Sequence, residues 1–218
     1  MSARPARPSP SASRGPALVV LAAGAGTRLG EVKALARLAD RPGGTALELL
    51  LAAGAALGDA RALVVTGGAH AAIAATLPPG VDVHPNERWN EGRTGSVRCA
   101  VSLRPERDLC LAPVDVPLVP AEVFSALAAE WSRRGAPARG WLGPFVLREG
   151  ARRFGHPVIL GRDLARDLKG FPAARPLSEL RARAAPLLAL EVGSAAILDD
   201  LDSPADLARL RARLAGSP

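Results

Sequence analysis

A glycine-rich segment near the start of the chain combines a freely turning backbone with two positive charges. Residues 21–33 read Leu-Ala-Ala-Gly-Ala-Gly-Thr-Arg-Leu-Gly-Glu-Val-Lys and overlap the end of an apolar run, Ala17–Ala22. Glycines after a buried strand allow a tight turn and let backbone N–H groups approach an anion. Arg28 and Lys33 add two full charges beside that turn. The segment is therefore predicted to bind nucleotide phosphates, as a triphosphate or as the pyrophosphate released from it.

The spacing within this segment argues against two common phosphate-binding loops. A Walker loop has Lys directly after its last glycine, followed by Ser or Thr, whereas Lys33 comes three residues after Gly30 and precedes Ala34. A dinucleotide-binding fold usually has an acidic residue near the end of its second strand. The second expected strand, 62–66, is followed by Gly-Gly instead. Neither a standard P-loop enzyme nor a Rossmann oxidoreductase is favoured.

Carboxylates suited to a metal ion occur far from this segment in the sequence. Asp115 comes directly after an apolar run, 109–114, where the carboxyl end of a buried strand is expected. Mg²⁺ prefers one or two carboxylates together with phosphate oxygens and water. Asp115 also suits a turn before Pro117, so both interpretations stay open here. A second acidic group lies near the end of the chain and contains Asp199, Asp200, Asp202 and Asp206. Asp206 follows Ser203-Pro204 in the first turn of an expected helix, as is typical of a capping acid.

Composition excludes several classes of protein. The 218 residues carry a formal net charge of +7, with 48% hydrophobic and 3% aromatic residues. The arginines are scattered at helical spacing without aromatic platforms, so we expect solvated helix faces and no nucleic-acid partner. Cys99 and Cys110 are too few for a disulfide framework, and buried thiols in a reducing cytoplasm are expected. No stretch reaches the roughly 20 apolar residues of a membrane helix, and no spacing suggests zinc or a Ser-His-Asp triad.

Short apolar runs alternate with Ala- and Leu-rich helical segments, which predicts an α/β fold with a mostly parallel sheet. Residues 1–15, rich in Pro, Ser and Arg, are predicted to be a disordered tail, and 16–218 a single domain. The expected strands are 17–22, 62–66, 81–84, 109–114, 141–147, 157–160, 187–192 and 195–198. The expected helices are 45–57, 70–77, 96–103, 120–133, 161–168, 177–184 and one starting at Ser203. A charged loop, 148–155, is expected between two of the strands.

Five ordered motifs resemble those of one family. The segment Leu-Ala-Ala-Gly-x-Gly-x-Arg-x-Gly-x-x-Lys is similar to the signature of the MobA-like nucleotidyltransferases, especially the branch that includes CTP:molybdopterin cytidylyltransferase. Further matches, in the family's order, are 86–96 (Asn-x-x-Trp-x-x-Gly-x-x-x-Ser), 115–117 (Asp-x-Pro), 155–157 (Gly-His-Pro) and 200–206 (Asp-x-Asp-Ser-Pro-x-Asp). The departures are a longer 34–45 connection, Val116 where Gln or Met is common, and Ser203 in place of Thr.

The resemblance implies a three-layer, Rossmann-like sandwich and a role for each matching residue. It implies that Asp115 and Asp202 hold Mg²⁺, with Asp200 as the alternative to Asp202, and that Arg28, Lys33 and Asp115 are catalytic. The implied nucleotide-binding residues are Leu21, Ala22, Ala23, Gly24, Gly26, Arg28, Lys33, Asn86, Thr94, Gly95 and Ser96. His156 and Arg153, from a basic loop that also contains Arg148 and Arg152, are expected to bind the acceptor. Asn86 and Ser96 also suit simple capping roles, and Trp89 suits a loop anchor better than an acceptor contact.

The resemblance implies a cytoplasmic enzyme that transfers a nucleotide from CTP to a phosphorylated molybdopterin-type cofactor and releases pyrophosphate. Its partners would be the nucleoside triphosphate, the acceptor, and a molybdoenzyme or its maturation factor. A transferase that uses GTP or UTP on a pterin or sugar phosphate is one alternative. A non-catalytic nucleotide-binding accessory protein is another, although such a protein has less need of two metal carboxylates.

Overall fold

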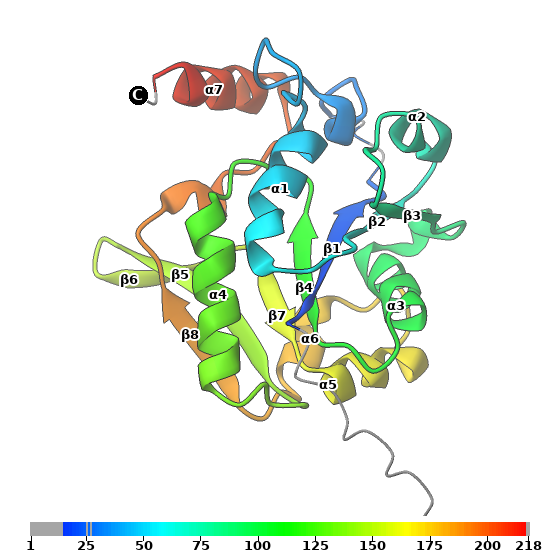
Figure 1. Ribbon diagram of the computed structural model, residues 1–218, viewed down its shortest axis with the longest axis vertical. Helices are drawn as coiled ribbons and strands as arrows, with labels where there is room; N and C mark the ends of the chain where they lie inside the picture. Colours follow the sequence, from blue (N-terminus) through cyan, green and yellow to red (C-terminus); the bar gives the residue numbers. More distant parts are fainter. Residues whose placement is uncertain (1–14, 25, 27, 217–218) are drawn as a thin grey trace, which may run out of the picture.

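The computed structural model describes residues 15–24, 26 and 28–216. All but the last residue of the predicted tail, 1–15, lies outside this range. Eight strands form one mixed sheet in the order β3-β2-β1-β4-β7-β5-β6, with β8 paired to β5 (Figure 1). The strands are β1 Ala17–Ala22, β2 Leu63–Thr66, β3 Asp82–Pro85, β4 Leu109–Pro113, β5 Trp141–Arg148, β6 Ala151–Phe154, β7 Val158–Leu160 and β8 Leu187–Glu191. The pairs β1–β2, β2–β3, β1–β4 and β5–β8 are parallel.

Helices cover both faces of the sheet and make the three layers. The α-helices are α1 Ala46–Gly54, α2 His70–Ala74, α3 Arg93–Leu103, α4 Ala121–Arg133, α5 Arg162–Arg166, α6 Leu177–Arg181 and α7 Pro204–Ala215. The described part of the chain also contains five short 3₁₀ helices: η1 Lys33–Leu35, η2 Ala55–Leu57, η3 Trp89–Glu91, η4 Asp167–Gly170 and η5 Ala195–Leu198. Alternate residues of β1 join two separate cores, one with α1, α4 and α7 and the other with α3, α5 and α6. The predicted sandwich is confirmed.

The central position of β1 explains where the glycine segment emerges. All six residues of β1 are buried, as a strand covered on both faces must be. Parallel neighbours on either side, β2 and β4, align their carboxyl ends with that of β1. The backbone N–H of Val114 donates to the carbonyl of Leu21 at 3.1 Å, which extends the pairing past the end of β4. The segment after β1 and Asp115 after β4 therefore leave the same edge of the sheet.

Three predicted elements differ in type or in starting residue from those observed, and the expected helices 70–77 and 177–184 end three residues early, at Ala74 and Arg181. Residues 195–198 form η5 rather than a strand, because Ser194 caps them by accepting a hydrogen bond from the Ala196 N–H at 3.3 Å. A four-residue apolar run does not distinguish strand from helix by itself. The expected charged loop contains β6, which pairs with β5 as an exposed edge strand. Helix α3 begins at Arg93 instead of Ser96, directly after Gly92 at φ +123°.

None of the helices among the described residues is long and apolar enough to cross a membrane. Both described cysteines are free thiols, and Cys110 is fully buried in β4. Burial strongly raises the pKa of the Cys110 thiol, so this side chain acts as an apolar core residue.

Candidate active site

A cavity of about 300 Å³, here called the small cavity, lies at the carboxyl edge of β1 and β4. Its walls come from four separate parts of the sequence: the glycine segment, the start of η1, the stretch from η3 to the first turn of α3, and the end of β4 with the residues that follow it. They consist of Leu21, Ala22, Ala23, Gly24, Lys33, Ala34, Trp89, Asn90, Gly92, Arg93, Ser96, Pro113, Val114 and Asp115. The structure therefore brings Lys33 and Asp115 to one hollow.

The turn that positions Lys33 requires glycine at residue 26. Gly26 has φ +63°, and a Cβ there would lie 2.2 Å from the carbonyl oxygen of Glu31. The N–H groups of Leu29 and Gly30 both donate to the carbonyl of Gly26, at 3.0 and 3.1 Å. Any side chain at this position would break the closed turn. The compact turn delivers the chain to η1, whose first residue is Lys33.

Lys33 and Arg28 both bind the carboxylate of Asp202. The Lys33 ammonium donates a hydrogen bond to Asp202 Oδ1, and Arg28 Nη2 lies 3.0 Å from Oδ2. The Lys33 hydrogen bond is the main cause that lowers the pKa of Asp202, and the Arg28 charge adds to it. The Lys33 side chain is only 15% exposed, whereas that of Arg28 is 75% exposed. Of the two cations, Lys33 is thus the one held at the cavity wall.

The acidic segment before α7 is also tied to Asp115. The N–H of Leu201 donates to the carbonyl of Asp115 at 2.7 Å. Burial raises the pKa of Asp200, and the neighbouring carboxylates of Asp115 and Asp202 raise it further. Asp200 is therefore close enough to Asp115 and to Asp202 to be repelled by both carboxylates.

Asp206 has a different role from these three carboxylates. Its side chain accepts from the N–H and hydroxyl of Ser203 while Ser203 Oγ accepts from the Asp206 N–H, which completes a capping box. The prediction that Asp206 caps the last helix is confirmed.

The donor set fits a hard divalent cation. Such ions prefer oxygen ligands, and Asp200 lies near the carboxylates of Asp115 and Asp202, which pair with Arg93 and with Lys33 and Arg28 in this structure. Among the described residues, no three His, Cys, Asp or Glu side chains form a ready-made metal cage. A Mg²⁺ ion held by Asp115 and Asp202 would therefore take its remaining ligands from phosphate oxygens and water.

Four of the implied nucleotide-binding residues come from the 86–96 motif, and of these four Ser96 lines the small cavity. Asn86 is 5% exposed, and its side chain donates to Ser96 Oγ at 3.2 Å and accepts from the Arg88 N–H at 3.1 Å. Thr94 donates to the carbonyl of Arg175 at 2.5 Å. A Cβ on Gly95 would lie 3.4 Å from the Asn86 side-chain nitrogen. Asn86 and Gly95 thus support the wall that presents Ser96, whereas Thr94 lines a second, larger cavity.

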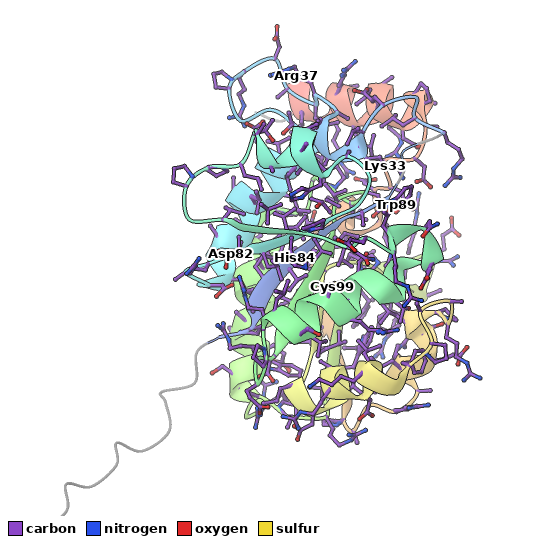
Figure 2. All side chains as sticks on the ribbon, turned by 90° about the vertical axis from the view of Figure 1, so that its right-hand side faces the viewer. Lys33, Arg37, Asp82, His84, Trp89 and Cys99 are labelled. Atoms are coloured by element: carbon purple, nitrogen blue, oxygen red, sulfur yellow. The ribbon has the colours of Figure 1, made fainter. Side chains whose placement is uncertain are left out.

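Trp89 occupies the space that Gly67 and Gly68 leave after β2. A Cβ on Gly67 would lie 2.8 Å from the indole Cγ, and one on Gly68 would lie 3.3 Å from the indole Cζ2. Figure 2 shows Trp89 beside Lys33, and both line the small cavity. The two glycines therefore leave room for the indole ring to pack against the backbone, which agrees with the expected role of Trp89 as a loop anchor.

A second cavity of about 610 Å³, here called the large cavity, adjoins the small one. The two share Leu21, Gly92, Arg93 and Pro113. Apolar side chains form much of the large cavity's wall: Trp141, Phe154, Val158, Leu177 and Leu187. The same wall also contains four arginines and one histidine: Arg93, Arg152, Arg175, Arg181 and His156. The combination suits an apolar molecule that carries a negative charge.

The expected acceptor residues His156 and Arg153 do not share this cavity. Arg153 pairs with Val146 on one face of the β5–β6 hairpin and lines, with Arg148, a further depression that shares Arg152 and Phe154 with the large cavity. Arg152 lies on the other face, with its guanidinium 4.7 Å from the centre of the Phe145 ring. The alternation of side chains along a strand therefore places Arg152, in place of Arg153, beside His156.

His156 is held as a neutral imidazole. Burial lowers its pKa to about 4, and the charge of Arg93 contributes. Its backbone N–H donates to the carbonyl of Ile197 at 3.0 Å, while Nδ1 has no hydrogen-bond partner among the described residues. At neutral pH the side chain offers the large cavity a polar group without charge.

This environment predicts that stability depends on pH through His156. An unfolded histidine titrates near 6.5, so between pH 6.5 and 4 the unfolded chain binds a proton that the folded chain does not. Stability is therefore lost as the pH falls through this interval. Between pH 7.5 and 5, the free energy of unfolding of the parent should fall by about 2 kcal/mol more than that of His156→Asn. Urea denaturation at the two pH values measures this, and equal losses in both proteins would contradict it.

Comparison with known protein families agrees with the fold and with the position of the glycine segment. A model of the MobA-like NTP transferase domain matches residues 18–187, well over half of the chain. The chain belongs to the MobA-like NTP transferase family. A search of curated proteins gave no significant match.

Solved structures share the fold over almost the whole chain. Rv0371c from Mycobacterium tuberculosis is 25% identical, with a TM-score of 0.75 over 93% of this chain and 100% of that chain. The structure of Rv0371c in complex with manganese is 24% identical in the aligned sequence, with a TM-score of 0.70 over 91% of this chain and 98% of that chain. Molybdopterin-guanine dinucleotide biosynthesis protein A from Archaeoglobus fulgidus is 16% identical, with a TM-score of 0.70 over 92% and 99%. The 2-C-methyl-D-erythritol 4-phosphate cytidylyltransferase from Thermus thermophilus is 20% identical, with a TM-score of 0.66 over 91% and 98%.

Three arginines of this MobA-like domain were not among the expected site residues. Arg93 lies between Gly92 and Ser96 and contacts Asp115, with Nη2 3.0 Å from Oδ2. Its place inside the glycine- and serine-containing motif was the available signal. Arg175 and Arg181 reach the large cavity from the region around α6, where the sequence shows only an ordinary charged helix.

Proposed function

We propose that the protein is a Mg²⁺-dependent nucleotidyltransferase that moves a nucleoside monophosphate, with CTP as favoured donor, to a phosphorylated acceptor such as a molybdopterin cofactor. An acceptor phosphate oxygen attacks the α-phosphorus, the bond to the bridging oxygen of the β-phosphate breaks, and pyrophosphate leaves. The observation that carries the proposal is that Lys33 and Asp115 line one small cavity, which adjoins a larger, arginine-lined one, while Asp202 is bound to Lys33.

The barrier to this reaction is largely electrostatic, because one anion must approach another. Lys33 and Arg28 now bind the Asp202 carboxylate, and from the same positions their side chains can bind the β- and γ-phosphates of the donor instead. Each hydrogen bond of this charged kind contributes about 1.5–3 kcal/mol when it is shielded from water. A bound Mg²⁺, held by Asp115 and Asp202, would neutralise phosphate charge. The backbone of the glycine segment and Ser96 hold the nucleotide, while Asn86 keeps Ser96 in place.

The large cavity supports an acceptor that is both apolar and anionic. Trp141 and Phe154 offer flat surfaces, and Arg152 and His156 offer hydrogen bonds at the same wall. A phosphorylated pterin has both properties, whereas a sugar phosphate lacks the apolar ring. The free thiols Cys99 and Cys110 agree with a reducing cytoplasm, where a molybdoenzyme or its maturation factor would receive the product.

A nucleotide panel separates the proposal from its alternatives. Thermal shifts with Mg²⁺ and each of CTP, GTP, UTP and ATP should be largest for CTP. Pyrophosphate release should then depend on both CTP and molybdopterin cofactor. A larger thermal shift with GTP or UTP than with CTP would mean that the donor is one of these alternatives. Nucleotide binding without pyrophosphate release from molybdopterin cofactor, a pterin phosphate or a sugar phosphate would favour the accessory protein.

A further inference from the structure

Arg93 is the charged residue that the small and large cavities share. It is the first residue of α3, and its side chain is 50% exposed. On one side its guanidinium contacts Asp115, and on the other it is close enough to His156 to contribute to the low pKa of that imidazole. The side chain thus lies at the boundary where the reacting groups of donor and acceptor must meet.

The position of Arg93 is not explained by the stability of α3. The positive end of a helix dipole lies at its N-terminus, so a cation in the first turn is unfavourable there. No acidic side chain is present in the first turn of α3 to compensate. The neighbouring residue Gly92 has φ +123°, which sets the direction in which the chain enters the helix. The charge is better explained by what it contacts in the cavities.

The contact between Arg93 and Asp115 is one that a ligand can break. The pair is partly exposed, at 50% for the arginine and 22% for the aspartate side chain, and such pairs are weak. A divalent cation on Asp115 carries twice the charge of the guanidinium. Once it is released, a guanidinium matches the oxygens of a phosphate in a forked geometry. Arg152, Arg175 and Arg181 already make the large cavity favourable for an anion.

We propose that Arg93 exchanges partners during the catalytic cycle: it holds Asp115 in the free protein and binds the phosphate of the acceptor when a divalent cation occupies Asp115. This inference rests on the proposed function, because it takes Asp115 as a metal ligand. The exchange couples the two cavities. A metal ion frees the guanidinium for the acceptor, and by reciprocity an acceptor phosphate strengthens metal binding.

The test uses the full chain with Mn²⁺ as the metal probe and phenyl phosphate as the acceptor probe. Free Mn²⁺ is followed by electron paramagnetic resonance without nucleotide. Arg93→Met should bind Mn²⁺ about two- to fivefold more tightly than the parent, since a competing cation is gone. Phenyl phosphate should tighten Mn²⁺ binding to the parent but not to Arg93→Met. Its own affinity should fall about tenfold in that variant.

Two further variants act as controls. Arg88→Met removes an exposed arginine that lies five residues before Arg93 and pairs with Glu91 outside both cavities, and it should behave like the parent. Arg93→Lys keeps the charge without the fork, so it should keep the parent's Mn²⁺ affinity while it binds phenyl phosphate more weakly.

The outcomes distinguish this inference from the proposed function. If Asp115→Asn abolishes Mn²⁺ binding but Arg93→Met equals the parent in both affinities and in their coupling, the partner exchange is wrong and the metal assignment stands. If Asp115→Asn binds Mn²⁺ as the parent does, the metal assignment of the proposed function is wrong and the exchange fails with it.

Discussion

Replacing Asp115 by asparagine is expected to reduce pyrophosphate release about 10³-fold while the fold stays intact. The substitution removes one negative charge from the wall of the small cavity and keeps the shape of the side chain. The contact that ties this residue to the acidic segment is made by its backbone carbonyl, which accepts from the Leu201 N–H, so the variant retains it. A coupled pyrophosphate assay with saturating CTP, Mg²⁺ and acceptor measures the loss.

Asp163→Asn is the matched control for this prediction. Asp163 is a partly exposed carboxylate on α5 that pairs with Arg166 and lines neither cavity. Both variants should keep the far-UV circular dichroism and melting temperature of the parent, but Asp163→Asn should keep its activity as well. Full turnover in folded Asp115→Asn would remove the catalytic role of this residue and leave nucleotide binding as a separate question.

Replacing Lys33 by methionine is expected to weaken triphosphate binding about 10- to 100-fold. The Lys33 ammonium is largely shielded from water, and the loss of one such charged hydrogen bond to phosphate has this effect on a dissociation constant. Methionine keeps most of the apolar length of the side chain, so the packing around η1 should survive. Calorimetric titration with CTP and Mg²⁺, and separately with pyrophosphate, measures the change.

The chain has one other lysine, Lys169, and it provides the control. Lys169 is exposed in η4 and lines neither cavity, so Lys169→Met should bind both ligands as the parent does. Arg28→Met should have a smaller effect than Lys33→Met, because the Arg28 side chain is far more exposed. Equal affinities in Lys33→Met and the parent would contradict the assignment of the glycine segment.

The two expected effects differ in kind because the residues act on different parts of the donor. Lys33 is placed for the leaving phosphates, which are present in both the bound and the reacting state, so its loss should mainly change affinity. Asp115 lies at the end of β4, next to the boundary between the cavities where charge is redistributed during transfer. Its loss should mainly change turnover. Measuring both the CTP affinity and the turnover number in each variant tests this division.

Local patterns in the sequence were sufficient to predict an α/β fold with a mostly parallel sheet and the place of its glycine-rich turn. The apolar run of β1 is long enough to indicate a strand buried on both faces, and the glycines after it need no tertiary contact to indicate a turn. Asp115 was predictable because parallel strands deliver their carboxyl ends to one edge of a sheet. Ser203 and Asp206 were predictable because a capping box involves residues three apart.

The tertiary structure alone decided which distant charges meet. Lys33 and Asp202 are 169 residues apart, and no periodicity in the sequence reports a contact over that distance. Which face of β6 presents Arg152 to the large cavity depends on the register of β6 against β5, since a shift of one residue would exchange it with Arg153. Arg93 contacts Asp115 from the first position of α3, which begins three residues earlier than its pattern indicates. Strand and helix propensities are local, whereas these charges are brought together by packing of elements that are remote in the sequence.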